Sequence, residues 1–248
     1  MWLDRFDTIL CDLDGCLISG DVVLPGAAEF VAWAGERLVV LSNNSTDTPE
    51  TLSTRLGTLG LKIPAERIVL AGTAALDHLT GVDGVRLRLY GSAALKVHAR
   101  QLGLDPDAEA PSHILLTRDE GFGYAQLCEC VRWCEKGAEL IIANPDRSHP
   151  AADGGAVPET GSLLAAIHAV LPEHPYTVIG KPEAMLYRHA LSRRTGGAKT
   201  VVAIGDNPAT DGLGATRQGL AHAIVGARSE DFPTFSVLMA CGGGPSTG

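Results

Sequence analysis

Four short apolar runs along the chain each stop at a cluster of polar residues. They cover residues 8–11, 38–41, 176–179 and 201–204, and a shorter run follows at 223–225. The runs do not alternate between apolar and polar positions, which is typical of strands buried on both faces. Segments with helical spacing of apolar residues lie between them, at 25–34, 49–59, 182–190 and 211–218. This order of strands and helices predicts an α/β fold with a doubly wound parallel sheet.

The middle of the chain carries strands and helices of its own. Strands are predicted at 85–90, where apolar residues alternate with arginines, and at the apolar runs 114–116 and 140–143. Helical spacing at 124–136 predicts a helix. One face of that helix is expected to hold Tyr124, Leu127, Cys128, Val131 and Cys134. A segment of about 95 residues is long enough for a small domain. We therefore expect a discontinuous core at 1–80 and 176–248, with a smaller α/β domain inserted at 81–175.

The polar clusters that end the four long runs hold the candidate chemistry. In doubly wound sheets, ligands bind outside the carboxyl ends of the strands. Clusters that are far apart in the sequence are therefore expected to meet in one crevice. The clusters are Asp12-Leu13-Asp14-Gly15, Ser42-Asn43-Asn44, Gly180-Lys181-Pro182, and Gly205-Asp206 with Asp211.

The carboxylates in these clusters predict a cation site. Asp12, Asp14 and Asp206 bring several carboxylate oxygens to one place, and such hard oxygen ligands favour Mg²⁺. Asp12 and Asp14 would point in opposite directions from a continuing strand, because side chains alternate. The chain must therefore turn there, and Gly15 permits a turn. One carboxylate can then attack while the other transfers protons.

Charge and composition limit the partners of the chain. The 248 residues carry a formal net charge of −9, so we expect neither a nucleic-acid polymer nor an anionic membrane as a partner. A small anion can still bind where donors gather, and Lys181, Ser42 and Asn43 are such donors. No apolar run approaches the roughly 18 residues of a membrane span, and the first residues do not resemble a signal peptide. A cytoplasmic protein is expected.

Taken together in this order, the four clusters resemble the four motifs of the haloacid dehalogenase (HAD) superfamily of phosphatases. Residues 20–27 resemble the NagD-like, or chronophin-like, branch of that superfamily (class IIA, C2 cap). Asn144-Pro145-Asp146, followed by His149-Pro150, Pro158 and Gly161, resembles the same branch. The resemblance extends to about Val225. It implies a Rossmann-like HAD core with an α/β cap inserted between the second and third motifs.

The resemblance implies a Mg²⁺-dependent phosphomonoesterase acting on a small phosphorylated metabolite. Asp12 would attack phosphorus and form an aspartyl-phosphate. Asp14 would protonate the leaving oxygen and later deprotonate the hydrolytic water. Asp12, Asp206 and the backbone carbonyl of Asp14 would hold the metal.

Further roles follow from the same resemblance. The cluster Ser42-Asn43-Asn44 and Lys181 would bind the phosphoryl group. Asp211 would orient Lys181 or a metal-bound water, or else cap the helix that follows it. His149 matches a position that contacts substrate in chronophin-like members, although a structural loop histidine is an equal alternative. A homodimer through the cap is expected by analogy.

Several questions stay open at this stage. Phosphomutase or dehalogenase chemistry, or a binding protein without activity on the same fold, are alternatives to the phosphatase. The sequence does not give the substrate or the oligomeric state. It also assigns no role to Cys16, Glu159 or Asn207, where the chain departs from the commoner pattern. Glu159 lies in a loop that usually reads Pro-Gly-x-Gly in the family, so we expect the shape of that loop to differ.

Overall fold

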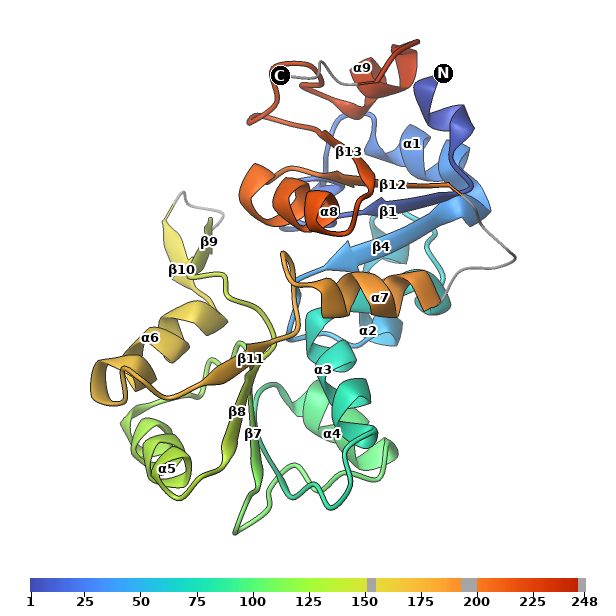
Figure 1. Ribbon diagram of the computed structural model, residues 1–248. Helices are drawn as coiled ribbons and strands as arrows, with labels where there is room; N and C mark the ends of the chain where they lie inside the picture. Colours follow the sequence, from blue (N-terminus) through green and yellow to red (C-terminus); the bar gives the residue numbers. More distant parts are fainter. Residues whose placement is uncertain (151–154, 193–199, 245–248) are drawn as a thin grey trace. The chain divides into compact units, whose positions relative to one another are not determined.

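The computed structural model describes residues 1–150, 155–192 and 200–244 (Figure 1). The chain divides into two compact units. The first unit consists of Met1–Ser42, Pro49–Val69 and Lys181–Gly248, and the second unit consists of Asn43–Thr48 and Leu70–Gly180. Each unit has a sheet of its own.

The first unit is built on a sheet whose strands follow the order β13-β12-β1-β4-β5. β1 pairs in parallel with both β12 and β4, and β12 pairs in parallel with β13. This confirms the predicted parallel sheet. The strand bounds are β1 (Thr8–Cys11), β4 (Leu38–Ser42), β5 (Ile68–Leu70), β12 (Val201–Gly205) and β13 (Ala221–Ile224).

Helices flank the strands of this unit (Figure 1). Helix α1 begins after Gly26, whose φ of 78° is a left-handed conformation that favours glycine. The ring of Phe30 in α1 stacks on Phe235 of α9 at 4.3 Å between centroids. The helices are α1 (Ala27–Ala34), α2 (Pro49–Thr58), α7 (Ala184–Ser192), the π-helix η4 (Pro208–Gly212), α8 (Leu213–Arg217) and α9 (Phe235–Ala240).

Short elements complete the first unit. β2 (Ile18–Ser19) and β3 (Val22–Val23) form an antiparallel hairpin soon after β1. Single 3₁₀ turns lie at Trp2–Arg5, Gly35–Arg37 and Ala65–Arg67.

The second unit contains a four-stranded sheet in the order β11-β8-β7-β6, with every pairing parallel. The run at 176–179 was predicted as a strand of the core sheet, but it forms β11 at the edge of this second sheet instead, next to β8. A separate antiparallel hairpin joins β9 to β10. The bounds are β6 (Leu87–Tyr90), β7 (His113–Leu116), β8 (Glu139–Ile142), β9 (Ser148–Pro150), β10 (Ala156–Pro158) and β11 (Tyr176–Val178), with α3 (Ala71–Thr80), α4 (Ala93–Gln101), α5 (Tyr124–Glu135) and α6 (Thr160–Val170).

One predicted helix face in this unit is partly wrong. Tyr124 was expected on the apolar face of α5, but its side chain is 83% exposed. Cys130, rather than Cys128, is buried together with Cys134, and Leu127 and Val131 pack against the same cluster. These four positions follow the spacing i, i+3, i+4 and i+7, so the buried stripe is rotated relative to the predicted one.

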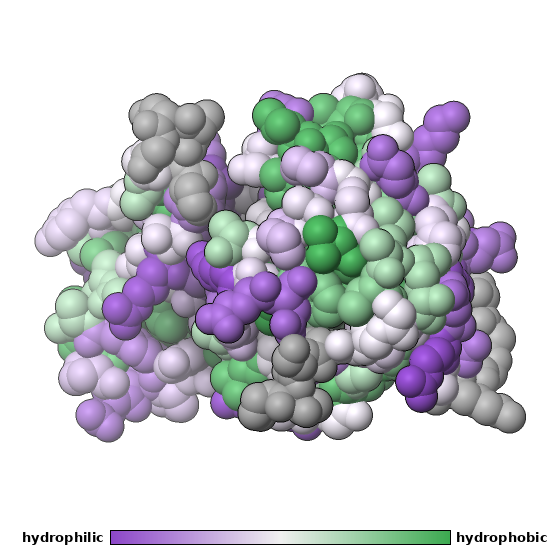
Figure 2. All heavy atoms as spheres, turned by 90° about the horizontal axis from the view of Figure 1, so that it is seen from above, coloured by the Kyte–Doolittle hydropathy of each residue, from purple (hydrophilic) through white to green (hydrophobic). Residues whose placement is uncertain are grey.

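The surface is mixed in character. Hydrophilic and hydrophobic residues are interspersed on the face drawn in Figure 2, as is usual for a folded protein surface. Within the described part of the chain, no helix has the length and apolar character needed to cross a membrane.

Candidate active site

The sheet of the first unit brings three of the predicted polar residues to neighbouring strand ends. Asp12 directly follows β1, Asp206 directly follows β12, and Ser42 is the last residue of β4. β1 lies between β12 and β4 in the sheet, and all three strands run in parallel. The backbone N–H of Asp12 donates to the carbonyl of Ile204 at 2.8 Å, which continues the ladder to the end of the sheet.

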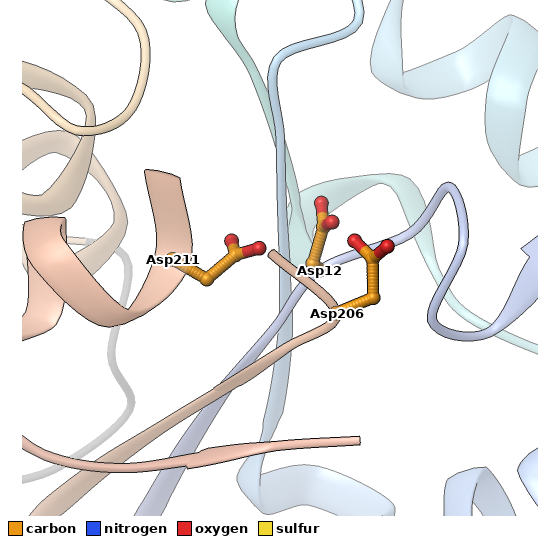
Figure 3. A group of neighbouring side chains, drawn as sticks. All are labelled: Asp12, Asp206 and Asp211. Atoms are coloured by element: carbon orange, nitrogen blue, oxygen red, sulfur yellow. The ribbon is translucent and has the colours of Figure 1, made fainter. Parts of the chain in front are cut away.

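Three carboxylates gather at this edge. One oxygen from each of Asp12, Asp206 and Asp211 lies within 4.8 Å of the others, and Figure 3 shows the three carboxyl groups turned toward a common space. Asp211 comes from η4, which starts after Asn207; the Asn207 side chain accepts a hydrogen bond from the Ala209 N–H at 3.0 Å. A Cβ added at Gly205 would overlap the Asp211 carboxyl group, so a side chain there would disturb the cluster.

Lys181 neutralises part of this charge. Its Nζ donates to Asp12 Oδ1 at 2.5 Å and to Asp211 Oδ1 at 2.7 Å. The residue is only 2% exposed, so both ion pairs are shielded from water. The Lys181 ammonium group therefore lies between the Asp12 and Asp211 carboxylates and contacts both.

Burial and charge shift the pKa values of these groups in a consistent pattern. Burial, assisted by the Asp211 charge, raises the pKa of Asp12 well above its ordinary value, although Lys181 opposes the shift. Burial also raises the pKa of Asp206. Burial alone would lower the pKa of Lys181, but the charges of Asp12 and Asp211 outweigh it, and the pKa is raised well above its ordinary value.

This donor set fits a hard divalent cation. Three carboxylates face one buried ammonium group, so the described side chains leave an excess of negative charge. Arg228 Nη1 donates to Asp206 Oδ2 at 3.1 Å, but the Arg228 side chain is 56% exposed and water screens its charge. All ligand atoms in the cluster are carboxylate oxygens, which Mg²⁺ and Ca²⁺ prefer.

Asp14 lies in the turn that the sequence predicts. Gly15 has a φ of 81°, and its N–H donates to the Ile18 carbonyl at 2.7 Å. A Cβ at Gly15 would lie 2.7 Å from Asp206 Oδ2, so this turn runs close against the carboxylate cluster. Asp14 itself is exposed, and its charge contributes to raising the pKa of Asp12. It is not one of the three carboxylates whose oxygens lie within 4.8 Å of one another.

The other predicted site residues lie in the second unit. Asn43 Nδ2 donates to Asp146 Oδ2 at 2.9 Å. Asn44 Oδ1 accepts from the backbone N–H groups of Thr46 and Asp47, both at 2.9 Å, and this turn holds the segment after β4 in shape. His149, in β9, makes a contact of 2.7 Å between its Nδ1 and Glu159 Oε1.

Two residues beside the cluster were not predicted from the sequence. The hydroxyl of Tyr187, which is 1% exposed, donates to the backbone carbonyl of Asp211 at 3.1 Å. Arg228 contacts Asp206 from the loop after β13. Helical spacing places Tyr187 on the helix that follows Lys181, which is a usable signal. Nothing in the sequence singles out Arg228.

The chain is similar to known hydrolases along most of its length. Residues 9–105 match the family described as haloacid dehalogenase-like hydrolase, and residues 178–230 match the family described as HAD-hydrolase-like. A dihydroxyacetone phosphatase of Corynebacterium glutamicum (strain R) is 33% identical over 220 residues, which make up 87% of this chain and 79% of that protein. The chain belongs to the haloacid dehalogenase-like hydrolases.

Further relatives of this HAD hydrolase lie in the NagD-like branch. The ribonucleotide monophosphatase NagD of Escherichia coli (strain K12) is 29% identical over 220 residues, or 88% of this chain and 86% of that protein. The solved structure of NagD from E. coli K-12 gives a TM-score of 0.84 at 26% identity and covers 93% of this chain and 97% of that chain. The expected Rossmann-like core with an inserted α/β cap is thereby confirmed.

A third relative has a structure with a metal. Glycerol phosphate phosphatase from Mycobacterium tuberculosis in complex with magnesium gives a TM-score of 0.81 at 28% identity, covering 89% of this chain and 67% of that chain. The relatives are phosphatases, and this HAD hydrolase is a phosphatase as well. The phosphomutase, dehalogenase and binding-protein alternatives are set aside.

Proposed function

We propose that this HAD phosphatase is a Mg²⁺-dependent phosphomonoesterase that hydrolyses small phosphorylated metabolites through an aspartyl-phosphate on Asp12. The observation that carries the proposal is the buried Lys181, held between Asp12 and Asp211 beside the Asp206 carboxylate. A buried cation within an excess of carboxylates suits a site that receives both a metal ion and a phosphoryl anion.

The metal would be held by Asp12, Asp206 and the backbone carbonyl of Asp14. When bound, it supplies positive charge that offsets the charge on the phosphoryl oxygens. The excess of carboxylate oxygens in the cluster supports this assignment, and the magnesium complex of the M. tuberculosis phosphatase supports Mg²⁺ as the ion.

In the first chemical step, a carboxylate oxygen of Asp12 attacks the phosphorus atom of the ester. A bond forms between Asp12 and phosphorus while the bond from phosphorus to the leaving oxygen breaks. Asp14 donates its proton to that leaving oxygen, so the product departs as a neutral alcohol. Lys181, through its contact with Asp12 Oδ1, fixes the orientation of the attacking carboxyl group.

In the second step, water hydrolyses the aspartyl-phosphate. Asp14 takes a proton from the water as its oxygen attacks phosphorus, and the bond between Asp12 and phosphorus breaks. Inorganic phosphate leaves, and both aspartates return to their starting state. Ser42, Asn43 and Asn44, together with Lys181, would bind the phosphoryl oxygens during both steps.

The second unit would act as the cap that contacts the leaving group and excludes bulk water. The relatives are named for ribonucleotide monophosphates, dihydroxyacetone phosphate and glycerol phosphate. These compounds share a phosphomonoester on a small polar leaving group, and we propose the same class for this chain. His149, on the β9–β10 hairpin of the second unit, is the proposed contact to that leaving group.

Burst kinetics with p-nitrophenyl phosphate test the mechanism, because p-nitrophenolate leaves without protonation. In the Asp14→Asn variant, we expect a burst of one p-nitrophenolate per enzyme, with steady turnover about 10² to 10⁴ times slower than in the unchanged enzyme. In the Asp12→Asn variant, neither burst nor turnover is expected. EDTA is expected to abolish the activity of the unchanged enzyme, and Mg²⁺ to restore it. An Asp12→Asn variant with the original rate would refute the proposal.

A homodimer through the cap, a cytoplasmic location and the exclusion of nucleic-acid polymers as substrates stay predictions. Sedimentation of the full chain and phosphate release from an oligonucleotide are the measurements that address the first and the last of them.

A further inference from the structure

The side chain of Glu159 contacts the imidazole ring of His149. Its Oε1 lies 2.7 Å from His149 Nδ1, across the base of the β9–β10 hairpin. The Glu159 side chain is only 15% exposed, whereas the His149 side chain is 38% exposed. A buried carboxylate therefore supports an imidazole ring that solvent can reach.

Helix capping does not explain the position of this carboxylate. Glu159 is the N-cap residue of α6, but its side chain makes no capping hydrogen bond to that helix. Its backbone N–H donates to the Arg147 carbonyl at 2.9 Å, which already closes the hairpin. The backbone of Glu159 thus closes the hairpin, and its side chain contacts His149 instead of capping the helix.

The positive charges near Glu159 favour the ionised form of its carboxylate, which accepts hydrogen bonds. Arg118 Nε lies 3.8 Å from Glu159 Oε1, while the Nη2 of the same arginine contacts Glu120 Oε1 at 2.9 Å. Burial raises the pKa of Glu159, opposed by the charges of Arg118 and His149. Because its pKa is raised, the ionised carboxylate reduces the stability of the fold near neutral pH, so its presence calls for another reason.

We propose that Glu159 is a positioning residue that fixes the tautomer of His149 and thereby the leaving groups that this phosphatase accepts. In the neutral ring, Nδ1–H donates to the Glu159 carboxylate, so Nε2 has no proton and acts as an acceptor. An acceptor at Nε2 selects leaving groups that carry an O–H or N–H donor, such as polyol phosphates. The inference rests on the proposed contact between His149 and the leaving group.

The substitution Glu159→Gln separates this role from a structural one. The glutamine has nearly the same size, but its amide N–H₂ can donate to Nδ1, and the ring then carries its proton on Nε2. The acceptor would become a donor without loss of packing. The matched control is Glu120→Gln, which removes a neighbouring carboxylate from Arg118 and leaves His149 Nδ1 with its partner.

Nitrogen-15 spectra of the histidine side chains read the tautomer directly. The chain has eight histidines, and the His149 signals are those missing from the His149→Asn variant. At about pH 8.5, where a free imidazole is neutral, we expect Nδ1–H in the unchanged protein and in Glu120→Gln. We expect Nε2–H in Glu159→Gln. Nε2–H in the unchanged protein would overturn the inference, whatever its phosphatase activity.

Kinetics then connect the tautomer to selectivity. The probes are glycerol 3-phosphate, whose leaving group carries hydroxyl donors, and p-nitrophenyl phosphate, whose leaving group carries none. We expect Glu159→Gln to lower kcat/KM for glycerol 3-phosphate about tenfold relative to p-nitrophenyl phosphate, with no loss of melting temperature. Equal losses on both substrates would overturn the inference. Failure of the unchanged enzyme to hydrolyse either substrate would instead refute the proposed function.

Discussion

Lys181 shows how strongly a single residue is tied to its surroundings in this site. It is almost fully buried and bonded to carboxylates on two sides, so removing its charge leaves Asp12 and Asp211 facing each other without compensation. We expect Lys181→Met to lower the free energy of unfolding by about 3 to 5 kcal/mol in EDTA, as is usual when one partner of a buried ion pair is removed. Urea unfolding followed by circular dichroism measures this loss.

The double variant Lys181→Met, Asp211→Asn is the control. It removes one of the two uncompensated carboxylates, so it is expected to regain a substantial part of the lost stability. A single variant that loses less than about 1 kcal/mol, the range of an exposed pair, would contradict the burial of these charges.

At the same scale, the sequence predicts the residues that chemistry requires but not their partners. Asp12 and Asp206 follow apolar runs, and the rule that ligands bind at the carboxyl ends of parallel strands was sufficient to bring them together. Tyr187, Arg228 and the contact between Glu159 and His149 depend on side-chain directions. Those directions come from packing between distant segments, and a single sequence carries no pattern for them.

At the scale of elements, Asp107 links helix α4 to strand β6 of the second unit. Lys96 and Arg100 of α4 contact its two carboxylate oxygens at 3.0 and 2.7 Å, and Asp107 forms an isolated bridge with Arg88 of β6. The hydrogen bond from Lys96 is the largest cause of a lowered pKa of Asp107, and the charges of Lys96, Arg100 and Arg88 add to it.

A carboxylate with a lowered pKa in the folded state adds stability above its unfolded pKa of about 3.9 and loses it as the pH falls through the folded value. We expect Asp107→Asn to be less stable than the unchanged protein at pH 7, by about 1 kcal/mol or less because the Asp107 side chain is 40% exposed. The difference should shrink as the pH falls below about 4 and vanish once the pH is below the lowered pKa of the folded state. Urea titrations at several pH values measure it, with the exposed Glu109→Gln as the matched loss of one charge. A difference that persists in acid would indicate a packing effect instead.

The sequence predicted whether a segment forms a helix or a strand better than it predicted which face is buried or which strand it pairs with. The apolar runs that became β1, β4 and β12 formed strands that are buried almost throughout, as is usual for such runs in sheets covered on both sides. The run that became β11 also formed a strand, but two of its three residues are exposed. For α5, a stripe starting at Tyr124 and a stripe starting at Leu127 both satisfy helical spacing, and only the packing of Cys130 and Cys134 into the core decides between them. The pairing of β11 with β8 was likewise not predictable, because an apolar run does not indicate which strand it pairs with.

At the scale of the whole molecule, the order of motifs carried more information than any single motif. The chain leaves the first unit after Ser42, returns to it for Pro49–Val69, and leaves again until Lys181. Asp12 and Asp211, whose carboxylates both contact Lys181, therefore lie on either side of the inserted unit in the sequence. The family resemblance predicted this insertion, whereas periodicity alone could indicate only that the middle segment has strands and helices of its own.

The same discontinuity predicts that a bound metal ion would stabilise the first unit. Asp12 lies near the start of the chain and Asp206 beyond the insertion, so a cation held by both ties together segments that are nearly 200 residues apart. A ligand that binds only the folded state stabilises it by about 2.7 kcal/mol at 100 times its Kd. This corresponds to a rise in Tm of about 5 to 10 °C for a chain of this size.

We expect this rise in Tm when Mg²⁺ replaces EDTA in thermal unfolding, and none when Na⁺ is added to the same ionic strength. Asp206→Asn should lose most of the rise, while Glu109→Gln keeps it; an equal rise in the Asp206→Asn variant would show that Mg²⁺ acts elsewhere on the protein.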